Sequence, residues 1–272
     1  MTAIASTRRP RLEGASTHIL EKSIGWVTIL VALGFWQIFS VAGVLSSDVF
    51  PSAGAVIVEL VQLIITSAFW LDIWATVSGA LIGLLLVLVI GSVAALLIGT
   101  MRPVDRSTWF VIEFLKPVPP IALIPLGLLL WGPSPTMKIA LVTFGAMWPF
   151  LTQMVYGIRQ TNNVALDMAS SYRLGWRLTT QHIVLPTLVP YALTGLRISA
   201  SIAVIVAVVT ELVGGADGIG QTIAVSQANG VLDTMYAYII TAGVLGVGIN
   251  VVFGLLEKPL LFWHPSQQGG KN

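Results

Sequence analysis

The feature that most constrains this chain is a set of long, uncharged apolar stretches, each bounded by charged residues. The clearest stretches lie between Lys22 and Asp48, between Asp72 and Arg102, between Lys138 and Arg159, and between Asp233 and Glu257. A helix needs about 20 apolar residues to cross the hydrocarbon core of a bilayer. Charged residues make up only 10% of the 272 residues, against roughly 25% in soluble domains. The sequence therefore predicts an all-α, polytopic membrane protein.

Six spans are predicted, and they form one domain, 24–263, between tails at 1–23 and 264–272. The spans lie at 24–45, 75–100, 109–131, between Lys138 and Arg159, at 188–213, and between Asp233 and Glu257. We interpret the first as an uncleaved span rather than a cleaved signal peptide, because its apolar run exceeds the usual length of roughly 7–15 residues. The segment 50–71 is apolar but interrupted by Glu59, so we expect an interfacial or packed helix there.

Lysine and arginine residues gather on one side of the predicted spans. They lie in the first tail, in the connections after the second and fourth spans, and after the sixth span. The connections 46–72, 132–135 and 214–233 contain neither residue type. Because short basic connections stay in the cytoplasm, this alternation predicts that both termini are cytoplasmic.

Several kinds of chemistry are disfavoured by what the sequence lacks. Without cysteine there is no disulfide, thiol catalyst or cysteine-bound zinc, and the three histidines, His18, His182 and His264, lie far apart. The glycine-rich stretch 214–220 lacks the lysine of a phosphate loop. No clustered catalytic set is seen, and a net charge of +2 indicates no nucleic-acid footprint. We therefore expect a membrane channel component that is not an enzyme and holds no metal or cofactor itself.

Two spans contain residues that are unusual on a lipid-facing helix. The second has small residues at multiples of four, namely Gly79, Gly83, Gly91, Ala95 and Gly99. Such a stripe favours close packing against another helix over a pore-lining role. The third contains Pro117, Pro119, Pro120 and Pro125. Because proline frees backbone carbonyls that need partners, we expect this span to be broken and to face the protein interior, either as a transporter feature or as a structural kink.

Charged residues at the ends of spans form a second group. Glu113 and Lys116 have the i, i+3 spacing of an ion pair near the cytoplasmic end. Arg197 lies several residues into the fifth span and is expected to extend its head toward the cytoplasm. Glu211 is predicted to face the interior of the bundle near Lys138, because a buried acid must be paired or neutralised.

The role of this acid leaves two interpretations open, a structural anchor or a residue that lines the substrate route. The candidates for the route are Glu211, Lys138, Pro120 and Trp148. An aromatic constriction is a further candidate, although interfacial and packing roles are favoured for its members, Trp131, Phe144, Trp148 and Phe150.

The connection 159–187 is the longest on the cytoplasmic side. Thr161, Asn162 and Asn163 are candidate N-caps, Gly175 is a candidate helix end, and Pro186 is expected to stop a second helical piece. These signals predict two short helices joined by a turn at the membrane surface. Either the element docks into the groove of a partner, or it rests on anionic lipid through its arginines.

This connection resembles the EAA loop of ATP-binding cassette importer permeases, whose pattern is E-A-A, three residues, Gly, nine residues, I-x-L-P. Asp167, Met168 and Ala169 fall on E-A-A without a gap, and 183–186 fall on I-x-L-P. Arg173 occupies the glycine position and Gly175 follows two residues later, so we expect a shifted turn. The stretches 117–132, 185–212 and 255–263 are similar to the nitrate, sulfonate and taurine branch of the same family.

The resemblance implies a type I importer permease fold in a bacterial cell membrane, with an extracytoplasmic solute-binding protein as one partner. It implies a pair of ATPase subunits that hold ATP and magnesium, and a second permease copy, the same chain being favoured over a different one. The implied substrate is a small anion such as a sulfonate, nitrate or carboxylate, or a pyrimidine-like heterocycle. The residues implied to contact the ATPase are Asp167, Met168, Ala169, Tyr172, Arg173, Gly175, Trp176, Leu185 and Pro186. The alternative is a secondary transporter or channel without an ATPase.

Overall fold

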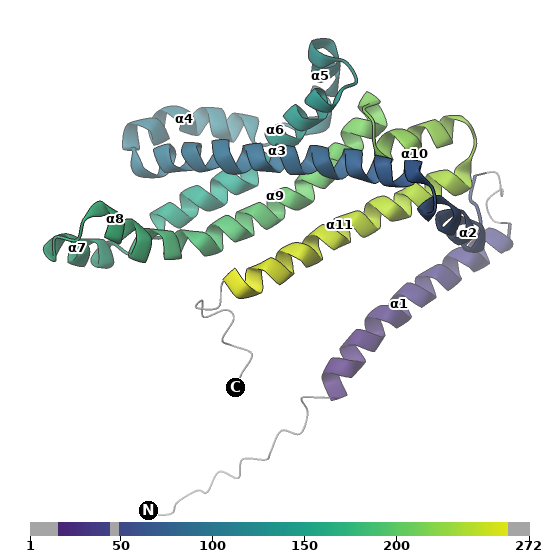
Figure 1. Cartoon of the computed structure of the whole chain (residues 1–272), viewed down its shortest axis with the longest axis horizontal. Helices are drawn as coiled ribbons and strands as arrows, with labels where there is room; N and C mark the ends of the chain where they lie inside the picture. The colour runs from purple at the N-terminus through teal and green to yellow at the C-terminus, as the bar shows by residue number, and fades with distance from the viewer. Residues whose placement is uncertain (1–15, 44–48, 261–272) are drawn as a thin grey trace, which may run out of the picture. The chain divides into compact units, whose positions relative to one another are not determined.

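The computed structural model describes residues 16–43 and 49–260, and every regular element within them is helical (Figure 1). The chain divides into two units, one ending at Glu59 and one beginning at Leu60. The elements are α1 (Ser16–Val41), α2 (Ala53–Ile64), α3 (Ser67–Thr100), α4 (Arg102–Leu115), the 3-10 helix η1 (Pro120–Leu123), α5 (Ile124–Trp131), α6 (Pro135–Arg159), α7 (Asn163–Ser171), α8 (Trp176–Thr179), the π-helical turn η2 (Thr180–Val184), α9 (Leu185–Gly214), α10 (Ile219–Ala228) and α11 (Leu232–Leu260).

The helix lengths confirm most of the predicted spans. Four described helical runs are long and apolar enough to cross a membrane: α3, α6, the run containing α9, and α11. α4 and the run Pro120–Trp131 that follows it are apolar enough when taken together but are bent by 87°, which fits a broken span or a re-entrant loop and confirms the break that the prolines predicted. α1 begins at Ser16, earlier than the predicted span, and its described apolar stretch, Val27–Val41, is shorter than the other spans. α2 has 12 residues, in agreement with the helix expected within 50–71.

In the first unit, the end of α1 is tied to the start of α2. The indole N–H of Trp36 donates to the Pro51 carbonyl at 3.1 Å, and the Ser40 hydroxyl donates to the Phe50 carbonyl at 3.2 Å. Residues 1–15 of the predicted tail 1–23 and all of the predicted tail 264–272 lie outside the described residues.

The core of the second unit consists of α3, α6 and α9, and the glycine stripe of α3 lies against α6. A Cβ atom on Gly83 would lie 2.5 Å from Val142 Cγ1, and one on Gly91 would lie 2.7 Å from Phe150 Cδ1. Val142 and Phe150 are both fully buried. Glycine at these positions therefore lets the two helices approach closely, which confirms the packing prediction.

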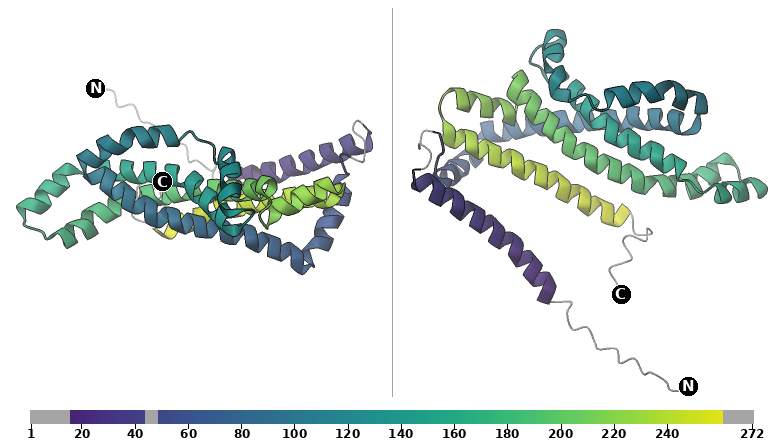
Figure 2. Two further views of the ribbon diagram at one scale, coloured as in Figure 1. Left: turned by 90° about the horizontal axis from the view of Figure 1, so that it is seen from above. Right: turned by 180° about the vertical axis from the view of Figure 1, so that it is seen from behind.

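The broken span turns back on α3. α4 follows α3 after one residue and runs beside its C-terminal half, as the views in Figures 1 and 2 agree. After the break, Pro120 lies against α6, where a Cβ on Gly145 would meet the Pro120 ring at 2.7 Å. Pro120 therefore packs on a core helix, whereas Pro117 and Pro119 within the break are exposed, so only part of the broken span faces the interior as predicted.

Candidate functional site

The connection between α6 and α9 projects from one end of the core, and its first helix begins with a side-chain cap. Asn162 Oδ1 accepts hydrogen bonds from the backbone N–H groups of Val164 at 2.9 Å and Ala165 at 3.4 Å. The structure therefore selects Asn162 from the three predicted caps. This cap satisfies N–H groups that have no partner within the helix.

The end of α7 corrects the expected turn. Arg173 has a φ of +52°, and the N–H of Leu174 donates to the Ala169 carbonyl at 2.9 Å while the N–H of Arg173 donates to the Ser170 carbonyl at 2.9 Å. This is the Schellman arrangement, in which glycine usually occupies the left-handed position. The turn is therefore not shifted to Gly175. The left-handed conformation costs about 1–2 kcal/mol in a residue with a Cβ, and here an arginine adopts it.

Gly175 and Pro186 also differ from expectation. Gly175 is extended, with φ −61° and ψ 153°, and it precedes α8 instead of ending α7. Pro186 does not stop a helix, because α8, η2 and α9 follow one another without a gap. The π-helical turn explains this. The Leu185 N–H donates to the carbonyl of Thr180, five residues earlier instead of four, so the helical hydrogen-bond pattern has already changed where Pro186 removes a donor.

This connection presents large apolar side chains to solvent. Val164, Met168 and Tyr172 recur every fourth residue along α7 and its C-cap, and Trp176 begins α8 after the turn; they are 66%, 55%, 76% and 79% exposed. We call these four residues the exposed row. Ala169, in contrast, is only 3% exposed, whereas Asp167, Gly175 and Leu185 are exposed and Pro186 is partly buried. The structure thus places seven of the nine predicted contact residues on the α7–α8 element, whereas Leu185 and Pro186 begin α9.

At the opposite end of the core, a buried ion pair joins α6 to α9. Lys138 Nζ lies 2.8 Å from Glu211 Oε1, and the two side chains are 2% and 0% exposed. The ammonium group also donates to the carbonyls of Ala75 and Asp217, each at 2.8 Å. Its three protons are therefore all engaged, and the predicted interior position of Glu211 beside Lys138 is confirmed.

The second carboxylate oxygen of Glu211 holds the turn into α10. Oε2 accepts from the Gly220 N–H at 3.0 Å and lies 2.9 Å from the Thr76 hydroxyl. A Cβ on Gly218, which has a φ of +144°, or on Gly220 would collide with the Glu211 side chain. Gly218 and Gly220 thus make room for the Glu211 side chain. We call Thr76, Lys138, Glu211 and Gly220 the buried polar centre.

A neighbouring cluster was not predicted from the sequence. Asp72 Oδ2 accepts hydrogen bonds from the Thr222 hydroxyl and the Tyr238 hydroxyl, each at 2.8 Å. Tyr238 is 2% exposed and packs edge-on against Phe69. Asp72 therefore ties α3 to α10 and α11 beside the buried polar centre. The only feature of the sequence that pointed to Asp72 was its position at the start of a predicted span.

The remaining route candidates lie apart from this centre. Trp148 is ten residues from Lys138 on α6, which corresponds to about 15 Å of helix. Its ring meets Phe144 edge-on with centroids 5.5 Å apart, and its buried Nε1 has no hydrogen-bond partner among the described residues. Phe150 packs in the core, and Trp131 is 44% exposed. No substrate route through Pro120 and Trp148 is defined by these contacts, so that role stays a prediction.

Among the described residues there are three further ion pairs, which are exposed or partly buried. Glu113 and Lys116 pair at 3.6 Å, as predicted. Arg197 forms an ion pair with Glu257 at 3.1 Å. The sequence predicted that Arg197 extends toward the cytoplasm, but it did not predict this partner. Arg159 binds Asp105 at 2.6 Å beside a cavity of about 260 Å³ between α3, α4 and α6, which was also not predicted.

Comparison with known proteins identifies relatives over most of the chain. The family described as "Binding-protein-dependent transport system inner membrane component" matches residues 87–260. A Bacillus subtilis protein named as an aliphatic sulfonates transport permease, SsuC, is 28% identical over 253 residues, 92% of each chain. The nitrate import permease protein NrtB of Leptolyngbya laminosa is 28% identical over 194 residues, 70% of this chain and 68% of that one.

The fold also matches a solved structure. An inward-facing structure of the MetNI methionine ABC transporter aligns with a TM-score of 0.61 and 17% identity, covering 72% of this chain and 97% of that chain. At this identity the match shows the fold alone.

Proposed function

Because this chain belongs to the family of inner-membrane components of binding-protein-dependent transport systems, we propose that it moves a small anion across the membrane when a partner subunit hydrolyses ATP. The chain is a multi-pass membrane permease subunit with the importer permease fold. The partner, the orientation, the copy number and the substrate are the finer parts of the proposal.

The exposed row is the observation that carries the proposal. Large aromatic and aliphatic side chains 55–79% exposed, carried by the capped helix α7 and the start of α8, are typical of a surface that another protein covers. The Asn162 cap and the Schellman turn hold the row in a fixed shape. We therefore assign the ATPase contact to the exposed row and its neighbours Asp167, Arg173, Gly175, Leu185 and Pro186, whereas Ala169, which was predicted to belong to this contact, is only 3% exposed and would support the element from within.

The continuous helix α8–η2–α9 can transmit movement of this contact surface into the membrane. α8, η2 and α9 run without a gap from Trp176 to Gly214, which is roughly 55 Å of helix. Movement of the exposed row by the ATPase would tilt α9 and, with it, the helices packed on α9. ATP and magnesium would act only on the partner, and the partner would favour one conformation of the permease through contacts that differ between the two.

The orientation follows from charge. The basic connections, including the α7–α8 element, would face the cytoplasm of a bacterial cell together with both termini. The solute-binding protein would meet the opposite face, formed by 46–72 and 214–233. A second copy of the chain would complete the channel.

The substrate assignment rests on the relatives, whose names refer to sulfonates and nitrate. The buried polar centre supports an anchoring role for Lys138 and Glu211 within it, because both charges are fully satisfied inside the chain. Pro120 and Trp148 stay candidates for the route.

Replacement of Trp176 tests the proposal. In vesicles that contain the whole assembly, Trp176→Ala should lower ATP-driven uptake of a radiolabelled alkanesulfonate by at least about tenfold, since a central aromatic anchor contributes 2 kcal/mol or more to an interface. Trp109→Ala, which removes a tryptophan 63% exposed on α4, is the matched control. Normal uptake by Trp176→Ala, or uptake driven by an ion gradient without any ATPase, would contradict the proposal and favour a secondary transporter.

A further inference from the structure

The α7–α8 turn carries an arginine in a conformation that favours glycine, and both arginines of this element lack a carboxylate partner among residues 16–43 and 49–260. We propose that Arg173, supported by Arg177, binds a carboxylate group on the partner ATPase and determines which ATPase the permease accepts. This inference rests on the proposed function, because it concerns the chemistry of the same contact surface.

The backbone of Arg173 is the first observation. Its φ of +52° is the only positive value among the described residues other than glycine. The turn closes through two backbone hydrogen bonds that need no side chain at this position. Glycine would therefore make the same turn with less strain. A side chain at a strained position indicates that the side chain itself has a use.

Unbalanced charge is the second observation. Arg173 and Arg177 are exposed, and neither makes an ion pair within the described part of the chain. Arg159 and Arg197, on the adjoining helices, are each paired with a carboxylate. Asp167 is the single acidic residue of the connection 160–187. Arg102 and Arg106 on α4 are likewise exposed and without an ion pair among the described residues, but Arg173 and Arg177 are the two such arginines that lie on the same element as the exposed row.

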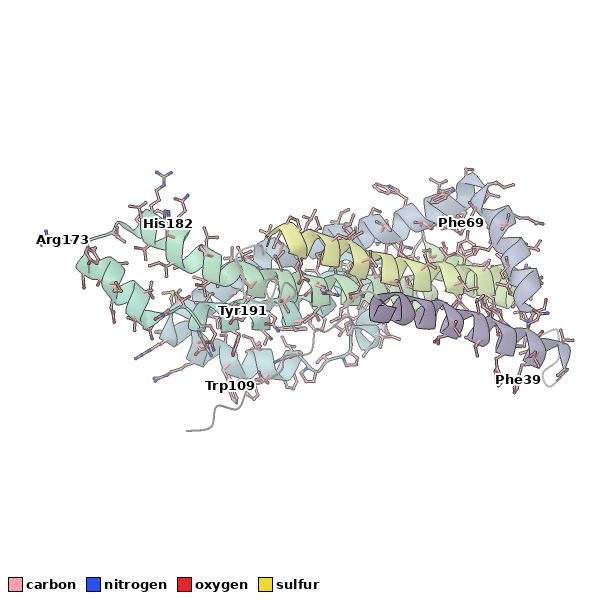
Figure 3. The ribbon with its side chains drawn as sticks, turned by 90° about the horizontal axis from the view of Figure 1, so that it is seen from below. Phe39, Phe69, Trp109, Arg173, His182 and Tyr191 are labelled. Atoms are coloured by element: carbon pink, nitrogen blue, oxygen red, sulfur yellow. The ribbon has the colours of Figure 1, made fainter. Side chains whose placement is uncertain are left out.

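The position of Arg173 favours a protein partner over lipid. Figure 3 places Arg173 at the far tip of the element, beyond His182 and Tyr191, and Figure 1 shows α7 and α8 beyond the end of α11. The exposed row lies on the same element, so a partner that covers Tyr172 would also meet Arg173. A guanidinium group held by a fixed turn suits the two-pronged geometry of a carboxylate, whereas a mobile headgroup needs no fixed donor.

Such a contact should govern selectivity and salt dependence. Charges at the edge of an apolar contact accelerate association and discriminate among partners through like-charge repulsion. An ATPase with basic residues at the matching position would be rejected even if its groove fitted the exposed row.

The test uses purified permease in nanodiscs and the ATPase that co-purifies with the wild-type chain. Arg173→Gly should keep or raise the melting temperature, because strain is removed, and should raise Kd for the ATPase by about five- to tenfold at low salt. The difference should shrink at high salt. Arg173→Lys keeps the positive charge but loses the planar guanidinium group, so its Kd for the ATPase should lie between those of the wild type and Arg173→Gly. Arg106→Ala, an exposed arginine on α4, is the control and should bind normally.

The outcomes separate this inference from the proposed function. If Arg173→Gly binds the ATPase like wild type at every salt concentration while Trp176→Ala does not, the arginine proposal is overturned and the coupling proposal stands. If Arg173→Gly instead weakens only the binding of the isolated permease to vesicles rich in phosphatidylglycerol, the arginine serves the membrane and the inference is again overturned. If no ATPase co-purifies with the wild-type chain, the proposed function itself fails.

Discussion

The two ends of the core contrast in how they treat polar and apolar groups. At one end, the buried polar centre encloses two charges and provides every hydrogen bond from within the chain. At the other end, the α7–α8 element exposes apolar rings and two arginines that make no ion pair within the described residues. The first arrangement is satisfied within one polypeptide, and the second is, under the proposed function, the surface that a partner covers. Changes at the first end should therefore affect stability, and changes at the second should affect transport.

The largest effect on stability is expected from Lys138→Met. This variant leaves Glu211 as an unpaired charge at a fully buried position and should lower the free energy of unfolding by about 3–5 kcal/mol. Thermal unfolding in detergent, followed by size-exclusion chromatography, measures the change. The double variant Lys138→Met with Glu211→Gln removes both charges and should recover at least half of the loss. No recovery would mean that the pair is not the source of the stability.

A smaller loss is expected where α3 meets α6. Gly83→Val places a side chain against Val142, where the added Cβ already lies 2.5 Å from Cγ1, and should cost about 1–3 kcal/mol through overpacking. Gly243→Val on α11 is the control, because open space surrounds that glycine in the structure. Equal melting temperatures for the two variants would refute close packing of the stripe.

Tyr238→Phe should have a smaller effect again. It removes one hydrogen bond to Asp72 while Thr222 keeps the other, so a loss of about 1 kcal/mol is expected. Tyr156→Phe, at a tyrosine 53% exposed, is the matched control in the same unfolding assay. A loss as large as that of Lys138→Met would show that Tyr238 belongs to the buried polar centre.

The smallest effect on stability, and the clearest separation of the two ends, is expected from Tyr172→Ala. Its ring is 76% exposed, so unfolding should change by less than about 0.5 kcal/mol. Uptake by the whole assembly should nevertheless fall by about fivefold or more if the ring is an anchor of the interface. If Tyr172→Ala lost stability but kept normal uptake, the α7–α8 element would matter for stability and not for transport, contrary to this comparison.

Sequence patterns predicted features that depend on one residue and its chemical needs. A buried acid needs a cation, so Glu211 and Lys138 could be paired before their distance was known, and four prolines in one span required a break. The Arg173 turn could not be predicted in this way, because its backbone hydrogen bonds override the preference of the residue for a right-handed conformation. The bond from Tyr238 to Asp72 joins residues 166 positions apart, and no local pattern contains that information.

The three engaged protons of Lys138 have a consequence for turnover. A bare ammonium group inside the bilayer would trap a passing anion and would have to release it in every cycle. Here the ammonium group is already occupied by one carboxylate and two carbonyls, so it has no free proton with which to bind a solute. A protein whose task is to hand solute onward is better served by such a self-contained pair than by a cation with free protons.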